Sequence, residues 1–225
     1  MVTAQDLKSV PLFSGLPKKQ LSALMAFATL RRYPRNSVVL RAGAKASGLY
    51  VLMSGRAKIL IADDAGREVI LSHLEAPDFF GEMGLFDDRA CLATVQTLAP
   101  SVLLHMSKAD FMRCLSTNLD LAIRITRALI KRLRDADRQI ESLALMDVYG
   151  RVARVLTDLA EKDDGRPVIV KPPSQQEIAS MIGATREMVN RVMKDLQATG
   201  HILVDKRRIV LLDKMGTRRP PLIGL

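Results

Sequence analysis

The sequence predicts an α+β chain in three parts: a compact antiparallel β-barrel or roll, one long helix, and two short helices followed by a β-hairpin. Three observations predict this order. Residues 37–104 consist of short apolar runs separated by glycines, residues 118–144 repeat apolar positions every three or four residues, and residues 174–212 carry two helical and two strand patterns. We therefore expect domains at residues 1–117, 118–146 and 147–225.

The composition predicts a globular protein with an anionic partner. Of its 225 residues 48% are apolar, enough for a buried core, and 34 Lys and Arg against 24 Asp and Glu give a net charge of +10. Such an excess of positive charge favours a polyanion as the binding partner; the alternative is that the charge only keeps the protein soluble. The two cysteines are too few for a disulfide framework, and no metal site is expected. Because no leader peptide and no apolar window of about 18 residues is present, we expect a cytoplasmic protein without a membrane segment.

The pattern of the first part predicts strands. Apolar runs occur at residues 37–40, 49–53, 57–61, 69–71 and 102–104, with glycines between them. This spacing is typical of a small antiparallel barrel or roll. Short helices are expected at residues 20–27 and after Ser107, which is a candidate N-cap.

The long helix is expected to pair with its copy in a parallel dimer. Its apolar positions alternate steps of three and four residues, which is a heptad pattern. In this register Arg132 and Asp137 occupy the g and e positions that pair across two parallel helices. The alternative is a helix packed on its own domain, because Ile123, Ile125 and Ile130 make other faces apolar too. The expected interface consists of Leu119, Ala122, Thr126, Leu129, Leu133, Ala136, Ile140 and Leu143.

The last part concentrates the positive charge. A helix is expected from Asp147 as its N-cap, and residues 163–167 are turn-rich and predict a connection. Residues 165–225 carry 11 Lys and Arg against 5 acids, a net of +6 of the total +10. This localisation weakens the solubility explanation and favours nucleic acid as the partner of the last part.

Two short helices with a glycine turn are predicted next. Ser174 and Glu177 form a capping box, and Gly183 can adopt the left-handed conformation that ends the first helix. Thr185 can cap a second helix to about residue 198, with Met188, Val189, Val192, Met193 and Leu196 as its apolar stripe. This is the helix-turn-helix arrangement.

The other side of the second helix carries groups that can contact base edges. Arg186, Glu187, Asn190 and Arg191 lie in its first two turns, where a helix that enters the major groove meets the bases. Arg binds guanine O6 and N7, and Glu accepts from the cytosine amino group. The alternative is a solvated charged face with pairs such as Glu187 and Arg191.

Residues 200–212 predict two strands joined by a basic turn, which makes a wing. Lys206, Arg207 and Arg208 at its tip suit DNA phosphates, which give affinity without base specificity. This basic hairpin strengthens the DNA-binding interpretation of the two helices before it.

Four segments together resemble the cyclic-AMP receptor protein and fumarate–nitrate regulator (CRP/FNR) family of bacterial transcription factors over nearly the whole chain. They are residues 80–86 (FGEMGLF), 143–148 (LALMDV), 176–179 (QEIA) and 186–191 (REMVNR). The resemblance implies a cyclic-nucleotide-binding-like double-stranded β-helix, or jelly-roll, as sensor at residues 1–117. It further implies a dimerisation helix with a hinge near Asp147, and a winged helix-turn-helix at residues 147–225.

The resemblance also implies DNA contacts and a further partner. Arg186, Glu187 and Arg191 match the three family positions that read the G·C pairs of a TGTGA-like half-site, so a palindromic operator is expected. Thr185 and Gln175 would contact phosphates. The connection at residues 162–167 lies where relatives contact RNA polymerase, which is therefore an expected partner.

The candidate effector pocket departs from that of the cyclic-AMP binders. Those proteins hold the cyclic phosphate by the backbone after the Gly-Glu pair, here Gly81, Glu82 and Met83, and by an Arg-Ser pair. Cys91 and Leu92 are aligned with that pair, so the anion loses its charge-assisted fork. Arg89 could replace it only if the loop is rearranged.

Two residues of the long helix also differ from those of the cyclic-AMP binders. Ala136 and Asp137 are aligned with the Thr-Ser pair that meets the adenine. A carboxylate accepts from guanine N1 and N2 but faces the acceptor N1 of adenine. Cyclic AMP is therefore disfavoured as the effector, and a guanine cyclic nucleotide such as cyclic di-GMP is the alternative. The preferred interpretation of Asp137 is an ion pair with Arg132 of a second copy.

Other effectors are disfavoured. A cysteine cluster for oxygen sensing is lacking, and haem would need an axial ligand such as His73 or His105, although lone histidines in strands are more often ordinary half-buried residues. Cys91 could respond to redox conditions, but a small apolar role is favoured.

The sequence therefore predicts a homodimeric, sequence-specific DNA-binding transcription regulator whose effector is other than cyclic AMP or is not needed. A DNA-packaging protein of low specificity is the alternative, and Glu187 disfavours it because a carboxylate facing DNA repels phosphates unless it reads a base. An enzyme is not expected, since the segment at Gly81 lacks the lysine of a phosphate-binding P-loop and no catalytic set is visible.

Overall fold

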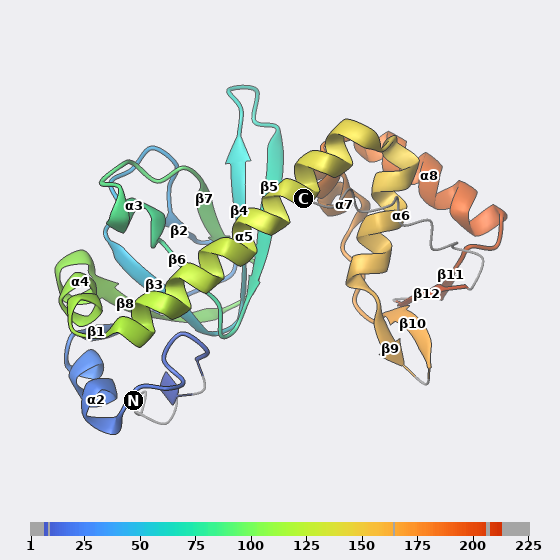
Figure 1. The fold of residues 1–225 in the computed structure, drawn as a ribbon. Helices are drawn as coiled ribbons and strands as arrows, with labels where there is room; N and C mark the ends of the chain where they lie inside the picture. The colour runs from blue at the N-terminus through green and yellow to red at the C-terminus, as the bar shows by residue number, and fades with distance from the viewer. Residues whose placement is uncertain (1–6, 9, 164, 206–207, 213–225) are drawn as a thin grey trace. The chain divides into compact units, whose positions relative to one another are not determined.

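The computed structural model describes residues 7–8, 10–163, 165–205 and 208–212. It divides into two compact units, Met1–Ala136 and Asp137–Leu225 (Figure 1). Each unit has its own hydrophobic core.

The first unit contains two four-stranded antiparallel sheets, which confirms the predicted β-roll. One sheet has the order β1-β8-β3-β6 and the other the order β2-β7-β4-β5. The strands of the first sheet are Ala28–Tyr33 (β1), Ser101–Ser107 (β8), Gly48–Ser54 (β3) and Phe79–Phe80 (β6). Those of the second are Val38–Leu40 (β2), Thr94–Thr97 (β7), Arg56–Ala62 (β4) and Glu68–Glu75 (β5).

Strand β3 is apolar on both faces. One face borders the core between the two sheets, and the other borders the core between the roll and its helices. Tyr50 and Leu52 point between the two sheets, where they meet buried side chains from both. Leu49 and Val51 point to the other side, toward the helices of this unit. This alternation follows from the two-residue repeat of a strand. The helices are α2 (Lys18–Ala26), α3 (Met83–Phe86), α4 (Lys108–Ser116) and the first part of α5 (Leu119–Leu145).

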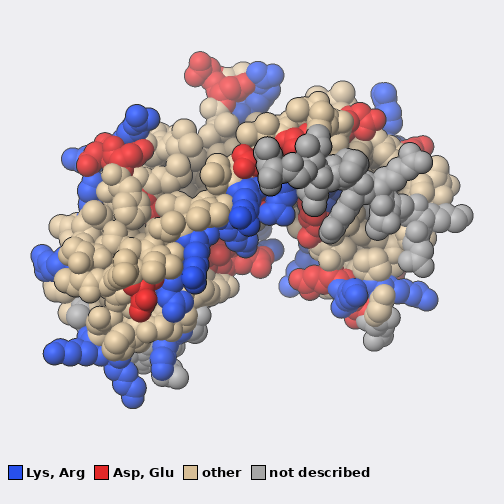
Figure 2. Space-filling model, viewed as in Figure 1, with Lys and Arg blue, Asp and Glu red and all other residues tan. Residues whose placement is uncertain are grey.

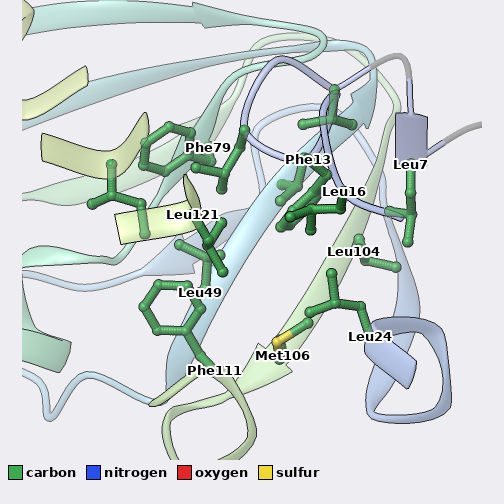
Figure 3. Close-up of a cluster of buried hydrophobic side chains, with 14 of the residues drawn as sticks. Leu7, Phe13, Leu16, Leu24, Leu49, Phe79, Leu104, Met106, Phe111 and Leu121 are labelled. Carbon is green, nitrogen blue, oxygen red and sulfur yellow. The ribbon is translucent and has the colours of Figure 1, made fainter. Parts of the chain in front are cut away.

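The helical side of the roll buries large side chains. Leu49 of β3, Phe111 of α4 and Leu121 of α5 lie together there (Figure 3), and each is at most 1% exposed. As predicted, Ser107 caps α4, because its hydroxyl accepts from the amide of Asp110. The core therefore fixes one side of α5 against the roll.

Helix α5 covers the expected span, and its packing differs from a simple heptad seam. The side chain of Asn118 accepts from the amide of Leu121 at 3.0 Å, as an N-cap does. Leu121 and Ile125 are buried, and Leu129 packs against the same core. Lys and Arg gather along much of the visible side of the helix (Figure 2). Its exposed large apolar residues are Leu119, Ile123, Ile130, Leu133, Ile140, Leu143 and Leu145.

In its described residues, the second unit combines the last part of α5 and three further helices with one four-stranded sheet of order β11-β12-β10-β9. Asp147 caps α6 as predicted, since its carboxylate accepts from the amide of Gly150 at 2.8 Å. The helices are α6 (Val148–Leu159), α7 (Gln175–Ile182) and α8 (Arg186–Ala198). The strands are Glu161–Asp163 (β9), Arg166–Ile169 (β10), Ile202–Asp205 (β11) and Arg208–Leu211 (β12).

The segment expected to be a connection is itself a hairpin. β9 and β10 pair antiparallel, with Arg166 opposite Asp163, and β10 also pairs with β12. The hairpin β11–β12 confirms the predicted wing strands. The turn expected within residues 163–167 is present at Gly165, and the flanking residues belong to strands that the sequence analysis did not predict, because β10 bonds to both β9 and β12.

No helix within the described ranges is long and apolar enough to cross a membrane.

Candidate nucleic-acid interface and effector site

The start of α7 is fixed by the predicted capping box. The amide of Glu177 donates to the hydroxyl of Ser174 at 3.2 Å, and the amide of Ser174 donates to Glu177 Oε2 at 2.7 Å. Two amides that would otherwise lack helical partners are thereby satisfied. Gln175, the first residue of α7, donates from its side chain to Asn190 Oδ1 of α8 at 3.3 Å.

The turn between α7 and α8 also follows the sequence. Gly183 has φ of 62° and ψ of 46°, the left-handed conformation that ends a helix. Thr185 then accepts from the amide of Met188 at 3.3 Å and caps α8. Ile178, Val189 and Leu196 are buried between the helices, so α8 is held in one orientation.

The expected base-reading residues are exposed at the start of α8. Arg186, Glu187 and Arg191 all project from the surface of the unit. The pKa of Glu187 is lowered, first by its own backbone amide and next by the hydroxyl of Thr185, so the carboxylate is charged at neutral pH. The ion pairs of the described residues do not include one between Glu187 and Arg191. The face is therefore available for an external partner.

One residue of the predicted apolar stripe lies outside the core. Met188 is 47% exposed, whereas Val189 and Met193 are buried. The sequence analysis assigned Met188, Val189 and Met193 to one apolar stripe, because successive residues of the stripe lie within about 100° of one another around a helix and can contact the same neighbouring element. The structure separates them, since the covered side of α8 faces α6, α7 and β11, and Met188 lies outside that side.

The basic wing is described in part. Arg208, at the start of β12, has its Nη1 atom 3.6 Å from Asp163 Oδ2, and both side chains are more than half exposed. An exposed pair of this kind contributes about 0–1 kcal/mol, so a phosphate can compete for Arg208. Lys206 and Arg207, the other two expected phosphate contacts, lie outside the described residues.

The Gly-Glu pair of the candidate effector pocket forms an internal ion pair. Glu82 is 1% exposed, and its Oε1 accepts from Arg132 Nη1 of α5. Arg132 also donates to the carbonyl oxygen of Phe79, and its guanidinium lies 4.9 Å from the centre of the Phe79 ring. Glu82 Oε2 is buried without a hydrogen-bond partner among the described residues.

This pairing corrects the expected role of Arg132. The heptad register assigned it to Asp137 of a second copy, and the structure gives it a partner in its own chain. A signal was present in the sequence: a glutamate between Phe79, Phe80 and Leu85 is expected to be buried, and a buried carboxylate needs a cation. Sequence reasoning did not identify which cation.

Arg132 is the cation that the described residues pair with Glu82, and the other residues of the candidate pocket are placed as follows. Gly81 has φ of +89°, and a Cβ atom there would lie 2.6 Å from the carbonyl oxygen of Gly48, so the backbone approach requires glycine. Leu92 is 71% exposed, and burial raises the pKa of the Cys91 thiol, which keeps it neutral. Arg89 and Met83 are exposed. Neither residue at the aligned Arg-Ser positions can therefore supply positive charge.

The two altered positions of the long helix are exposed. Ala136 ends the first unit, and Asp137 begins the second. An exposed carboxylate at Asp137 is free to accept hydrogen bonds from an external donor.

The histidines considered as haem ligands lie in different sheets. His73 belongs to β5 and His105 to β8. The ring of His105 packs 4.7 Å from that of Tyr50, and burial, followed by the charge of Arg31, lowers its pKa. His105 therefore has the packing of a buried neutral residue.

Comparison with known proteins assigns both units. A family model for the cyclic nucleotide-binding domain matches residues 30–118, and one for the Crp-like helix-turn-helix domain matches residues 150–216. The chain is 34% identical over 210 residues to the cAMP-activated global transcriptional regulator Vfr of Pseudomonas aeruginosa, covering 89% of this chain and 95% of Vfr. It is 33% identical over 205 residues to the cAMP-activated global transcriptional regulator CRP of Pasteurella multocida, covering 88% of this chain and 95% of that protein.

A solved structure agrees with these matches. The c-di-GMP responsive global regulator CLP of Xanthomonas campestris superposes with a TM-score of 0.74 at 30% identity, covering 87% of this chain and 99% of CLP. These relatives are transcriptional regulators and not enzymes. With matches to both domain models and to relatives over most of its length, the chain belongs to the CRP/FNR family of DNA-binding transcription regulators.

Proposed function

We propose that this chain acts as a homodimer that reads a palindromic, TGTGA-like operator with the start of α8. The observation that carries this proposal is the exposed group of Arg186, Glu187 and Arg191 in the first two turns of that helix. Arg can bind guanine O6 and N7 with two hydrogen bonds, and a charged Glu can accept from the cytosine amino group. The pattern therefore suits G·C pairs.

Phosphate contacts would hold α8 in register. We assign them to Thr185 and Gln175 at the two helix starts and to Lys206, Arg207 and Arg208 of the wing. Arg208 would exchange its exposed partner Asp163 for a phosphate. Such contacts add affinity for every sequence, so specificity would rest on α8.

DNA packaging with little sequence preference is the competing function. The charged carboxylate of Glu187 argues against it, because an anion at the tip of the helix repels a duplex unless it accepts a hydrogen bond from a base.

The decisive experiment is selection of bound duplexes from a random pool by the full chain, followed by affinity measurements at fixed salt. We expect a palindrome bound roughly 10³-fold or more tightly than random duplex. Arg186→Ala should abolish discrimination at one G·C pair. Lys194→Ala, an exposed cation later in α8, is the control and should change affinity for all sequences alike. A preference under about tenfold would support packaging instead.

For the effector we propose a ligand other than cyclic AMP, or none. The support is chemical: exposed Leu92 and neutral Cys91 offer no charge-assisted hydrogen bond to a cyclic phosphate. A guanine cyclic nucleotide is the second candidate, because CLP is c-di-GMP responsive and because the carboxylate of Asp137 can accept from guanine.

Calorimetric titration of the ligand-free chain with cyclic AMP, cyclic GMP and cyclic di-GMP tests this assignment. We expect no saturable heat with cyclic AMP. Operator binding measured alongside distinguishes an effector-independent regulator, which binds without ligand, from one that needs a guanine nucleotide. Tight binding of cyclic AMP, as in the curated relatives described as cAMP-activated, would reject the assignment.

A further inference from the structure

Helix α8 leaves one large apolar side chain outside the core. Met188 is 47% exposed, while Val189, Met193 and Leu196 are at most 8% exposed. An α-helix turns by about 100° per residue, so Met188 lies roughly a quarter-turn from the centre of the buried face, on the side of Arg191. It thus borders the face that carries Glu187 and Arg191.

The position of Met188 along the helix is also fixed. Its amide donates to the hydroxyl of Thr185 at 3.3 Å, which makes it the third residue of α8. Side chains in a helix tilt toward the N-terminus, so the thioether extends toward the end that carries Arg186 and Glu187. That end is the part of a recognition helix that meets base edges.

Packing within the unit does not account for Met188. It is absent from the hydrophobic clusters formed by the described residues, whereas Met181 of α7 packs against the core of this unit. A phosphate contact does not account for it either, because a thioether has no hydrogen to donate and phosphate oxygens only accept.

We propose that Met188 recognises a thymine of the half-site by packing against its C5-methyl group. This inference rests on the proposed function, which places α8 in the major groove. Among the base edges in the major groove, the thymine C5-methyl is the apolar group that a side chain can pack against, beside the hydrogen-bond donors and acceptors of the four base pairs. An apolar side chain beside Glu187 and Arg191 therefore adds a T·A preference next to the G·C pairs that they read.

The test removes the methyl group from the DNA and the thioether from the protein. Each thymine of one selected half-site is replaced in turn by deoxyuridine, which lacks only the C5-methyl, and the affinity of the full chain is measured. At one position the wild-type chain should lose about fourfold, the value of one buried methyl group. Met188→Ala should bind the methylated and demethylated duplexes equally, and Met188→Leu should retain part of the difference.

Met181→Ala is the matched control, because it removes the same side chain from α7, and it should keep the full fourfold difference. Thermal melting confirms that each variant is folded. A deoxyuridine effect that survives Met188→Ala unchanged, or no effect at any thymine, would overturn the role of Met188 while the preference for the operator over random duplex stands. Loss of that preference in the wild-type chain would instead overturn the proposed function.

Discussion

At the scale of single residues, the first unit contains a buried ion pair between Glu82 and Arg132. Burying a carboxylate costs several kcal/mol unless a cation compensates it, and Glu82 is almost wholly buried. Arg132 compensates one oxygen and also bonds the carbonyl of Phe79. One side chain of α5 therefore holds the helix to the segment that leads into the candidate effector pocket.

Removing the cation should expose this dependence. We expect Arg132→Ala to lower the free energy of unfolding by about 3 kcal/mol, the lower end for breaking a buried pair, because the Arg132 side chain is 34% exposed. Urea unfolding followed by circular dichroism measures it. Adding Glu82→Gln should recover part of the loss, since a neutral amide needs no counter-charge.

Arg127→Ala is the control on the same helix. Arg127 is exposed and has no ion pair with another described residue, so its loss should cost no more than about 0.5 kcal/mol. Equal losses for Arg127→Ala and Arg132→Ala would show that the pair does not stabilise the unit.

At the scale of elements, helix starts were readable from the sequence and several strands were not. Ser174 and Asp147 bond amides three residues away, so the signal lies within one turn of chain. Strand β1 was missed because its middle residues are all exposed, which leaves no apolar alternation. Strand β9 was missed because it consists of three charged residues at the edge of the described sheet, where its neighbour is β10.

The glycine between α7 and α8 offers a test at this scale. Gly183→Ala should lower stability by about 1–2 kcal/mol, because a Cβ atom is strained in the left-handed region. Crowding adds little, since the nearest atom to a Cβ there would be Leu143 Cδ2 at 3.7 Å. Thermal denaturation of the full chain measures the change.

Gly150→Ala is the matched control. Gly150 lies in α6 with no atom closer than 3.4 Å to an added Cβ, so alanine there should leave stability unchanged or raise it by up to about 1 kcal/mol. Similar losses at both glycines would rule out backbone strain at Gly183 as the cause.

At the scale of the whole molecule, the uncovered apolar residues of α5 favour self-association. Exposed apolar residues recur every three to four positions along much of the helix, at Leu119, Ile123, Ile130 and Leu133. The position between Ile123 and Ile130 in this row is polar, because Thr126 occupies it. This row differs from the seam expected from the sequence, because Leu129 packs on the roll and Ala122 is half-buried. A second copy of the row would cover it in a parallel pair of helices.

A charge placed in this row should prevent the proposed dimer. We expect Leu133→Glu to sediment as a monomer and to lose most of its operator affinity, because the second half-site is no longer bound by the same particle. Lys131→Glu introduces the same side chain a little under half a turn around the helix from Leu133 and should remain dimeric. A dimeric Leu133→Glu variant would place the interface elsewhere.

The sequence by itself determined the order of domains, the helix caps, the left-handed glycine and the charged tip of α8, because each depends on residues within a few positions of one another. Only the tertiary structure decided that Arg132 meets Glu82, that Met188 is left exposed, and which apolar residues of α5 are uncovered. These outcomes depend on which side of a helix another part of the chain covers. Helical periodicity gives several apolar or charged sides, and contacts between residues distant in sequence select among them.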